Sequence, residues 1–269
     1  FFAGARDLAA IRAVTDAQGT AVEQALDHLR QAVPLPRYPC VHPPAAYLEA
    51  HIEQATQLEQ ARATLGVVTG IQGKVTWQVT LRGEQGHAGT VPMAERRDVL
   101  RCFTRMAQQL YQAVGEADHH VMFTIGRLEM QPNAPSVIPD MLTFRIDLRH
   151  PDDQRLRQLR VLTERLMGEL AAPCELVMER LSEAAPNTFD ARLQQMVSDA
   201  AAARGYPSIP LLSAAGHDAR YLATICPSAM IFIPCRAGIS HAPQEWAEPE
   251  HVSAGAQVLL DVAVRWLGL

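Results

Sequence analysis

Hydrophobic and polar residues alternate strictly in the middle of the chain, and this alternation predicts β-strands. Apolar residues occupy every second position over residues 75–81 and again over residues 142–148. A period of two places successive side chains on opposite faces of a strand, so each segment is expected to bury one face. Residues 121–130 and 174–181 are predicted as two further strands.

Two segments between these strands carry apolar residues at helical spacing. One helix is predicted over residues 99–114, and Pro151-Asp152 begin a second helix that extends to residue 170. The order over residues 72–182 is therefore strand, helix, strand, strand, helix, strand, which is the ferredoxin-like arrangement of an α+β domain. Its two helices are expected to cover one face of a four-stranded antiparallel sheet.

The segment before this middle region mixes helical and strand patterns. Residues 7–32 have helical spacing that is interrupted at Gly19, and the proline-rich residues 32–44 are predicted to form a loop. Apolar and polar residues alternate over residues 47–53, which predicts a strand. Residues 66–73 are interpreted as a connection between structured elements.

The segment after the middle region again predicts an α/β structure. Residues 190–205 have the pattern of a capped helix, and Ser253 begins a final predicted helix. The short apolar runs 209–212 and 229–233 are typical of buried parallel strands.

These changes of pattern predict two domains, one inserted into the other. The expected fold is an α/β domain formed by residues 1–71 and 183–269. It is interrupted by the ferredoxin-like (βαββαβ) α+β domain of residues 72–182.

Composition and charge exclude several classes of protein. The chain has 269 residues, of which 48% are hydrophobic and 20% charged, which is typical of a globular protein. Its 24 basic and 29 acidic residues give a formal net charge of −5, so nucleic acid and membrane surfaces are not expected partners. No apolar run approaches the roughly 20 residues that a membrane span needs.

The cysteines and the first residue add two expectations. The five cysteines are scattered without a CxxC pair, which favours reduced thiols in a cytoplasmic protein. The chain starts at Phe1, without a methionine, inside a segment patterned like folded structure. We therefore expect the beginning of a longer protein to be missing.

Four of the ten histidines follow or end predicted strands: His51, His87, His217 and His241. His51 shares the polar face of its strand with Glu49 and Glu53. Loops at strand ends are where α/β proteins bind ligands, and imidazole is a common zinc ligand. The four could therefore share a metal site, or each could be a separate hydrogen-bonded loop residue. The nucleophile-elbow, phosphate-loop, dinucleotide-binding and HExxH motifs are absent from the sequence.

Five short motifs follow one another in an order that resembles a known enzyme family: His51-Ile52-Glu53-Gln54, Gly86-His87-Ala88-Gly89-Thr90-Val91-Pro92-Met93, Ile146-Asp147-Leu148-Arg149-His150, Ala215-Gly216-His217-Asp218-Ala219 and Gly238-Ile239-Ser240-His241. The set resembles the amidase and carbamoylase branch of the dinuclear-zinc aminoacylase and carboxypeptidase-G superfamily. That branch contains N-carbamoyl-L-amino-acid hydrolase, allantoate amidohydrolase and β-ureidopropionase. The resemblance extends over nearly the whole chain.

The resemblance implies a metal centre and a catalytic histidine. His51 and His241 would be ligands of two divalent metal ions, which are zinc, manganese or nickel in the family. His87 would approach the active site of the neighbouring subunit and polarise the scissile carbonyl group. The resemblance further implies that residues 1–71 and 183–269 form an α/β metal-binding catalytic domain that is incomplete at its N-terminus. It implies that residues 72–182 are a lid domain that also forms a homodimer.

The resemblance also implies residues that bind the substrate. Gln54 would face the amide or ureido group, and Arg149 would hold the substrate carboxylate. Gly216 and His217 would line the pocket beside the metal ions. Ser136 stands where the family has an asparagine that assists the arginine.

Several departures from the family leave more than one function open. The first metal histidine, the bridging aspartate and the consecutive glutamate pair have no counterpart in this sequence, and Ala55-Thr56 replace a Gly-Pro pair. The first hypothesis is a metal-dependent amidohydrolase acting on an N-carbamoyl-L-amino acid or a related ureido acid. In that case this chain by itself is expected to be inactive. The alternatives are a non-catalytic dimerising or ligand-binding module, and a hydrolase of acyl amino acids or dipeptides.

Overall fold

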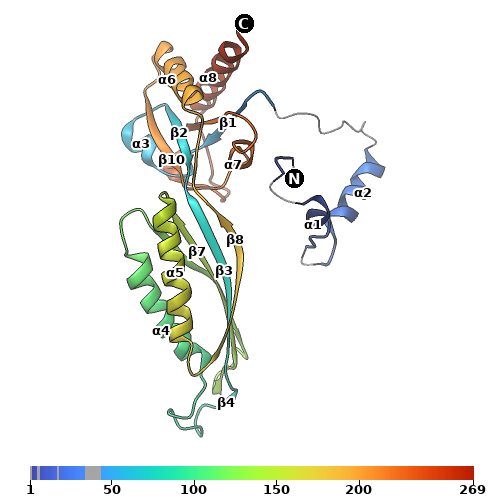
Figure 1. The fold of residues 1–269 in the computed structure, drawn as a ribbon, viewed down its shortest axis with the longest axis vertical. Helices are drawn as coiled ribbons and strands as arrows, with labels where there is room; N and C mark the ends of the chain where they lie inside the picture. Colours follow the sequence, from blue (N-terminus) through green and yellow to red (C-terminus); the bar gives the residue numbers. More distant parts are fainter. Residues whose placement is uncertain (1, 5–6, 17, 34–43) are drawn as a thin grey trace. The chain divides into compact units, whose positions relative to one another are not determined.

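The computed structural model describes residues 2–4, 7–16, 18–33 and 44–269 (Figure 1). The chain forms two compact units. Unit 1 is assigned residues 1–69, 189–211 and 216–269, and unit 2 comprises residues 70–188 and 212–215. Most of the predicted loop over residues 32–44 lies outside the described residues.

Unit 2 contains a four-stranded antiparallel sheet in the order β5-β7-β3-β8. The strands are β3 (Gly73–Arg82), β5 (Met122–Gln131), β7 (Met141–His150) and β8 (Glu175–Ala184). All four were predicted from the pattern of apolar residues along the chain. In β3 and β7, buried side chains alternate with more exposed ones, as the sequence predicted. A short second pair, β4 (Gly86–His87) with β6 (Val137–Ile138), also belongs to this unit.

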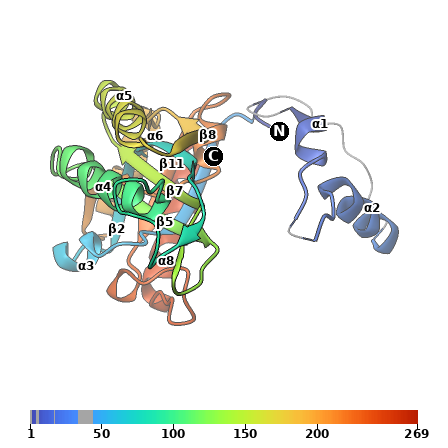
Figure 2. The same ribbon diagram turned by 90° about the horizontal axis from the view of Figure 1, so that it is seen from below.

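Two helices cover one face of this sheet (Figures 1 and 2). They are α4 (Val99–Leu110), which continues as a π-helical turn over Tyr111–Gly115, and α5 (Asp153–Leu170). Each begins at an aspartate whose carboxylate accepts backbone N–H bonds, Asp98 for α4 and Asp152 for α5. The core between helices and sheet includes the fully buried Trp77 and Phe144.

The sheet of unit 1 is mixed. The strand β1 (Tyr47–Ile52) is parallel to β11 (Ser228–Ile233), and β11 is antiparallel to β2 (Leu65–Ile71). The strands β9 (Asn187–Thr188) and β10 (Ser208–Ser213) lie beside β2. The parallel arrangement predicted from short apolar runs is therefore correct for β11 with β1 and wrong for β11 with β2.

The prediction that residues 66–73 connect two elements is wrong, because most of this stretch belongs to the buried strand β2. The glycines of this strand allow neighbouring residues to approach its backbone closely. A Cβ atom at Gly66 would lie 2.6 Å from Leu211 Cδ2. A glycine in a strand marks such an approach as readily as it marks a turn.

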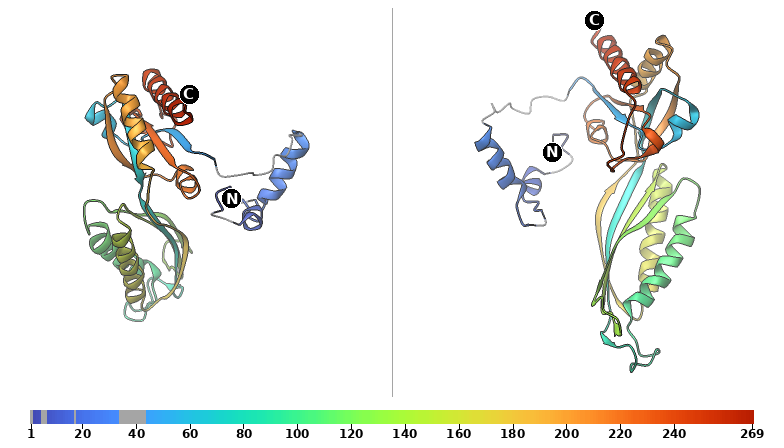
Figure 3. Two further views of the ribbon diagram at one scale, coloured as in Figure 1. Left: turned by 45° about the horizontal axis from the view of Figure 1, so that its top comes forward. Right: turned by 180° about the vertical axis from the view of Figure 1, so that it is seen from behind.

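Two long helices, α6 (Ala191–Ala203) and α8 (Pro249–Leu267), pack with the sheet of unit 1 into one hydrophobic core (Figure 3). Helix α8 begins four residues before the predicted Ser253, because Pro249 occupies its first turn, where no backbone N–H is needed. The short helices are α3 (Gln57–Ala61), α7 (Ala219–Leu222) and a 3₁₀ turn over Arg236–Gly238. Helices α1 (Leu8–Arg12) and α2 (Val22–Ala32) contain no buried residue.

Among the described residues, none of the helices has both the length and the apolar surface required to cross a bilayer. The four described cysteines are buried free thiols: Cys102, Cys174, Cys226 and Cys235.

Candidate active site

His51 is the last residue but one of β1, which runs parallel to β11. Its partner in the strand register is Phe232. Its Nδ1 is 2.8 Å from the carbonyl oxygen of Ile52, and a ring nitrogen that faces a carbonyl carries the proton. The Nε2 atom of His51 therefore has the lone pair, which is the form of imidazole that a metal ion binds.

His217 lies next to His51 although the two are far apart in sequence. The ring centroids are 4.6 Å apart with the ring planes nearly perpendicular. His217 Nδ1 is 3.4 Å from Oε1 of Glu49, and the His217 side chain is only 2% exposed. The other oxygen of Glu49 accepts bonds from the Ala219 N–H at 3.0 Å and the Tyr47 hydroxyl at 3.1 Å. Glu49 therefore holds the first turn of α7 and the His217 ring against β1.

This arrangement changes the acidity of two groups. Burial opposes ionisation of Glu49, but the hydrogen bonds from His217, Ala219 and Tyr47 outweigh it and lower the pKa of that carboxyl group. Burial and the neighbouring Glu49 raise the pKa of Tyr47 to about 12. Glu49 is thus an anion, and Tyr47 remains a hydrogen-bond donor to it.

His241 and Gln54 form a second pair in unit 1. The amide nitrogen of Gln54 lies 3.5 Å from His241 Nε2, a long contact in which the amide is the donor. Both residues have left-handed backbone angles, with φ of 60° at Gln54 and 56° at His241. Residues other than glycine rarely adopt such angles, and they are concentrated at functional sites.

Contacts on both sides hold these two loops in place. Gly238 has φ of 66°, and a Cβ atom there would lie 2.9 Å from the carbonyl carbon of Ala55. The N–H of His241 donates to Glu245 at 3.0 Å. Glu53 accepts the N–H groups of Gln57 and Leu58 at the start of α3. Glu53 therefore supports the loop rather than sharing the polar face with His51.

The residues described in unit 1 fit only part of a metal centre. His51 and His241 each present an imidazole lone pair, but zinc takes four ligands. In the described part of the chain, no three or more histidine, cysteine or acidic side chains are grouped to hold a metal ion. Gly216, which the resemblance places in the pocket, directly precedes His217. The space around its Cα is open, because a Cβ atom added there would meet no atom within 4 Å.

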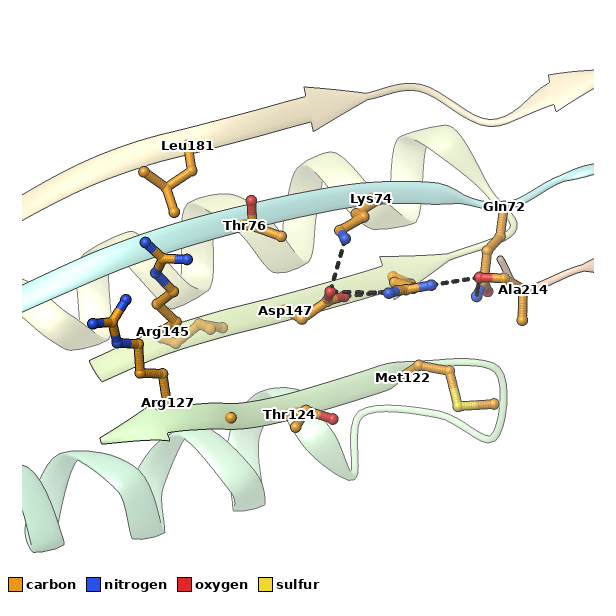
Figure 4. A pocket seen from close by; sticks show the side chains of 13 residues that line it. Gln72, Lys74, Thr76, Met122, Thr124, Arg127, Arg145, Asp147, Leu181 and Ala214 are labelled. Carbon is orange, nitrogen blue, oxygen red and sulfur yellow. Dashed lines mark hydrogen bonds and ion pairs between the residues drawn. The ribbon is translucent and has the colours of Figure 1, made fainter. Parts of the chain in front are cut away.

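Arg149 is partly exposed on β7, on the same face of the strand as Asp147, which Figure 4 shows beside Lys74. Its Nε and Nη2 donate to the two oxygens of Asp147 at 2.7 and 3.0 Å. Its Nη1 donates to the carbonyl oxygen of Ala214 at 2.6 Å, and Gln72 donates to the same oxygen at 3.1 Å. The guanidinium group is therefore fixed in one plane, with three of its five N–H groups used.

The ion pair stabilises the charged form of both partners. Burial opposes ionisation of Asp147, but bonds from Arg149 and Lys74 outweigh it and lower its pKa. The bond to Asp147 raises the pKa of Arg149 despite its burial. The two residues line a hollow of about 710 Å³ on the sheet. Its other lining residues are Gln72, Lys74, Thr76, Met122, Thr124, Gly126, Arg127, Arg145, Ile146, Leu181 and Ala214.

His87 and Ser136 come together at the β4–β6 pair of unit 2. His87 is the register partner of Val137, and the N–H of Ala88 donates to the Ser136 carbonyl at 3.0 Å. The N–H of Gly89 donates to His87 Nδ1 at 3.0 Å. A neutral His87 therefore carries its proton on Nε2, which makes that atom a hydrogen-bond donor at an exposed position.

Three residues that organise these groups were not predicted from the sequence: Glu49, Asp147 and Lys74. Glu49 was noted as a neighbour of His51 on the strand, but its contact with His217 joins segments 168 residues apart in the chain. Asp147 and Lys74 had a detectable signal. Asp147 is two residues from Arg149 on one strand, so both side chains share a face, and Lys74 is the only lysine in the sequence.

Comparisons with known proteins agree with the motif resemblance. The chain is 32% identical to the allantoate amidohydrolase of Bacillus subtilis over 223 residues, which cover 82% of this chain and 54% of that protein. It is 36% identical to the N-carbamoyl-L-amino acid amidohydrolase of Geobacillus stearothermophilus, covering 80% of this chain and 53% of that protein. The chain thus spans about half the length of these curated relatives.

A solved structure and a family model match most of the chain. The crystal structure of a hydantoinase/carbamoylase family amidase from Burkholderia vietnamiensis superposes with a TM-score of 0.89 at 34% identity, covering 98% of this chain and 64% of that chain. The model of the peptidase family M20/M25/M40 matches residues 3–265. The predicted relationship to amidohydrolases is confirmed, and the chain belongs to the peptidase family M20/M25/M40.

Proposed function

We propose that the whole protein is a metal-dependent amidohydrolase that cleaves a C–N bond of an N-carbamoyl-L-amino acid or a related ureido acid such as allantoate or ureidopropionate. The observation that carries the proposal is the grouping of His51 with His217, and of Gln54 with His241, at strand ends of a chain whose relatives have these activities. The conclusion applies to the whole protein because the chain spans about half of those relatives.

We assign His51 and His241 as ligands of two divalent metal ions. When bound, the ions would polarise the substrate carbonyl group and supply hydroxide near neutral pH. His51 Nε2 is available for this purpose because Ile52 O holds the proton of Nδ1. Gln54 donates to His241 in this structure, and we propose that its amide turns to the ureido group when substrate binds.

Arg149 is the proposed carboxylate-binding residue. A planar guanidinium group suits a carboxylate, and Asp147 and Ala214 hold this one in a single orientation. Two of its five N–H groups make none of these three hydrogen bonds and are available to a ligand. Ser136 lies beside His87 and not in the hollow that Arg149 lines, so it would assist the arginine of a partner subunit. His217 with Gly216 would line the space beside the metal ions.

His87 is the proposed oxyanion-stabilising residue. Its Nε2–H can donate a hydrogen bond, which suits the negative charge that develops on the carbonyl oxygen. We propose that residues 72–182, which lie within unit 2, are a ferredoxin-like lid that brings His87 to a partner subunit in a homodimer. Residues 1–71 and 183–269 would form the catalytic domain of a cytoplasmic protein.

The test is release of ammonia and amino acid from a substrate panel by the whole protein, with metal content measured by elemental mass spectrometry. The panel is N-carbamoyl-L-alanine, allantoate, ureidopropionate, N-acetyl-L-alanine and an alanine dipeptide, and His241→Ala is the control. We expect metal binding and turnover of a ureido acid by the whole protein, and no turnover by the 269-residue chain alone.

Other results would point to the alternatives. Preference for N-acetyl-L-alanine or the dipeptide would make the protein an acyl-amino-acid or peptide hydrolase. A whole protein that binds no metal and turns over nothing would be a ligand-binding or dimerising module.

A further inference from the structure

Lys74 is the only lysine in a sequence whose other 23 basic residues, of the 24 counted, are arginines. It lies on β3, directly opposite Arg149 on β7 in the strand register. Both side chains are partly exposed and line the same hollow, in which Figure 4 labels Lys74. Like charges directly opposite each other destabilise a sheet, so this pairing needs a compensating anion.

Asp147 supplies only half of that compensation. Lys74 Nζ lies 3.0 Å from Asp147 Oδ2, the oxygen that also accepts from Arg149 Nη2. Two cations and one carboxylate leave a net charge of +1 in this group. Among the described residues that line the hollow, Asp147 is the only acid, whereas Lys74, Arg127, Arg145 and Arg149 are basic.

Unused hydrogen-bond donors accompany this excess charge. An ammonium group has three N–H donors, and one points to Asp147, so two remain on Lys74. Arg149 likewise keeps two. The side chains of Lys74 and Arg149 are 37% and 28% exposed, so both sets of donors reach the hollow rather than the core.

We infer that Lys74 and Arg149 together form a two-cation site for the ligand carboxylate, with Asp147 as the residue that positions both cations. This rests on the proposed function and extends its carboxylate site to a residue on a second strand. The ammonium group adds a point charge beside the planar guanidinium fork. Bound in this way, the ligand carboxylate neutralises the remaining positive charge.

The test uses the fact that Lys74 is the only ε-amine in the chain. The 269-residue protein is treated with limiting acetic anhydride, and acetylation of Lys74 is followed by peptide mass spectrometry, with the α-amine of Phe1 as the internal reference. N-carbamoyl-L-alanine at saturation should slow Lys74 acetylation at least fivefold. Ethylurea, which is the same molecule without the carboxylate, should leave the rate unchanged.

Affinities measured by calorimetry complete the experiment. Lys74→Gln should weaken binding of N-carbamoyl-L-alanine about tenfold, and Lys74→Arg should recover part of this loss. Arg82→Gln is the matched control, because Arg82 is exposed on the same face of β3 and does not line the hollow, and it should bind normally. In the whole protein Lys74→Gln should raise KM with little change in kcat, which loss of folding would not produce.

The outcomes separate this inference from the proposed function. Binding that is lost in Arg149→Gln but leaves Lys74 unprotected, with Lys74→Gln unchanged, would overturn the two-cation site and leave the substrate class intact. Absence of binding to either the 269-residue chain or the whole protein would overturn both.

Discussion

The two candidate ligand sites are built in different ways. In unit 2, Lys74, Asp147 and Arg149 lie on neighbouring strands of one antiparallel sheet, where register alone brings them together. In unit 1, strand β1 and the loop that follows it carry Glu49, His51 and Gln54. These residues meet His217 and His241, which lie in loops more than 160 residues further along the chain. Gln54 and His241 both have left-handed backbone angles.

The difference shows what each kind of site depends on. A site on a sheet face needs only the alternation of side chains and the correct strand pairing. A site made of loops needs each loop to be held in an unusual conformation by packing elsewhere. Substitutions in the two sites should therefore have different consequences, and five expected outcomes follow in order of decreasing effect.

The largest effect should distinguish chemistry in unit 1 from binding in unit 2. His51→Ala should reduce kcat of the whole protein at least 10³-fold, on the order of 4 kcal/mol, because a metal ligand is lost. Arg149→Lys should instead raise KM roughly 10–100-fold with a small change in kcat, because the planar fork is lost. Steady-state kinetics of both variants on one substrate would measure the changes in kcat and KM separately. Equal effects of both variants on kcat would contradict this division.

The next largest effect concerns the two hydrophobic cores. Phe144→Ala in unit 2 and Ile231→Ala in unit 1 each remove a fully buried side chain of a hydrophobic core and should cost about 2–5 kcal/mol of unfolding free energy. Hydrogen exchange followed by mass spectrometry should show lost protection in the unit that carries the change. If either variant removes protection from both units equally, the two do not unfold independently.

Backbone conformation near His241 should have a smaller effect. Gly238→Ala places a Cβ atom 2.9 Å from the Ala55 backbone at positive φ and should cost about 2–3 kcal/mol. Gly205→Ala is the control, since Gly205 has a φ of 70° but nothing within 4 Å of a Cβ atom. It should cost about 1 kcal/mol. Urea unfolding of both variants measures the two losses of unfolding free energy. Equal losses would mean that the loop at Gly238 moves to accommodate the added Cβ atom without further cost.

Helix caps should contribute similarly in the two units. Asp98 accepts two N–H bonds at the start of α4, and Asp190 accepts one from Leu193 at the start of α6. Replacing either by alanine should cost about 1 kcal/mol. Thermal unfolding with asparagine variants as controls would measure this, because asparagine retains the cap. A cost that persists with asparagine would place the stabilisation in the negative charge instead.

The smallest effect is a pH dependence confined to unit 2. Burial slightly opposes ionisation of Asp118, but hydrogen bonds from Arg155, the His120 N–H and His150 lower its pKa from 3.8 to about 2. Because the folded pKa is depressed, the stabilisation is complete above about pH 4 and is lost as the pH falls toward 2. It should lie within the ~1 kcal/mol of an exposed ion pair. Unfolding of Asp118→Asn between pH 2 and 5 should show a flatter pH profile than the parent, and an unchanged profile would exclude Asp118 as the source.

Much of unit 2 could be predicted because its elements are contiguous and locally consistent. Strict alternation in β3 and β7 assigned Trp77 and Phe144 to the core, and both are fully buried. The same alternation places Asp147 and Arg149 on one face. In unit 1 the glycines of β2 resembled a loop, because their role lies in contacts with residues far along the chain, such as Leu211.

The sequence by itself determined most of the strands and helices, though not β2, and the buried face of the sheet in unit 2. It also determined the set of motifs that resembles the amidohydrolases. Only the tertiary structure decided that Glu49 holds His217, that His241 faces Gln54, and that Lys74 and Arg149 share one carboxylate. The physical reason is the distance along the chain over which each kind of information acts. Side-chain periodicity acts over a few residues and is visible along the chain, whereas pairing between distant strands and loops is set by packing of the whole unit.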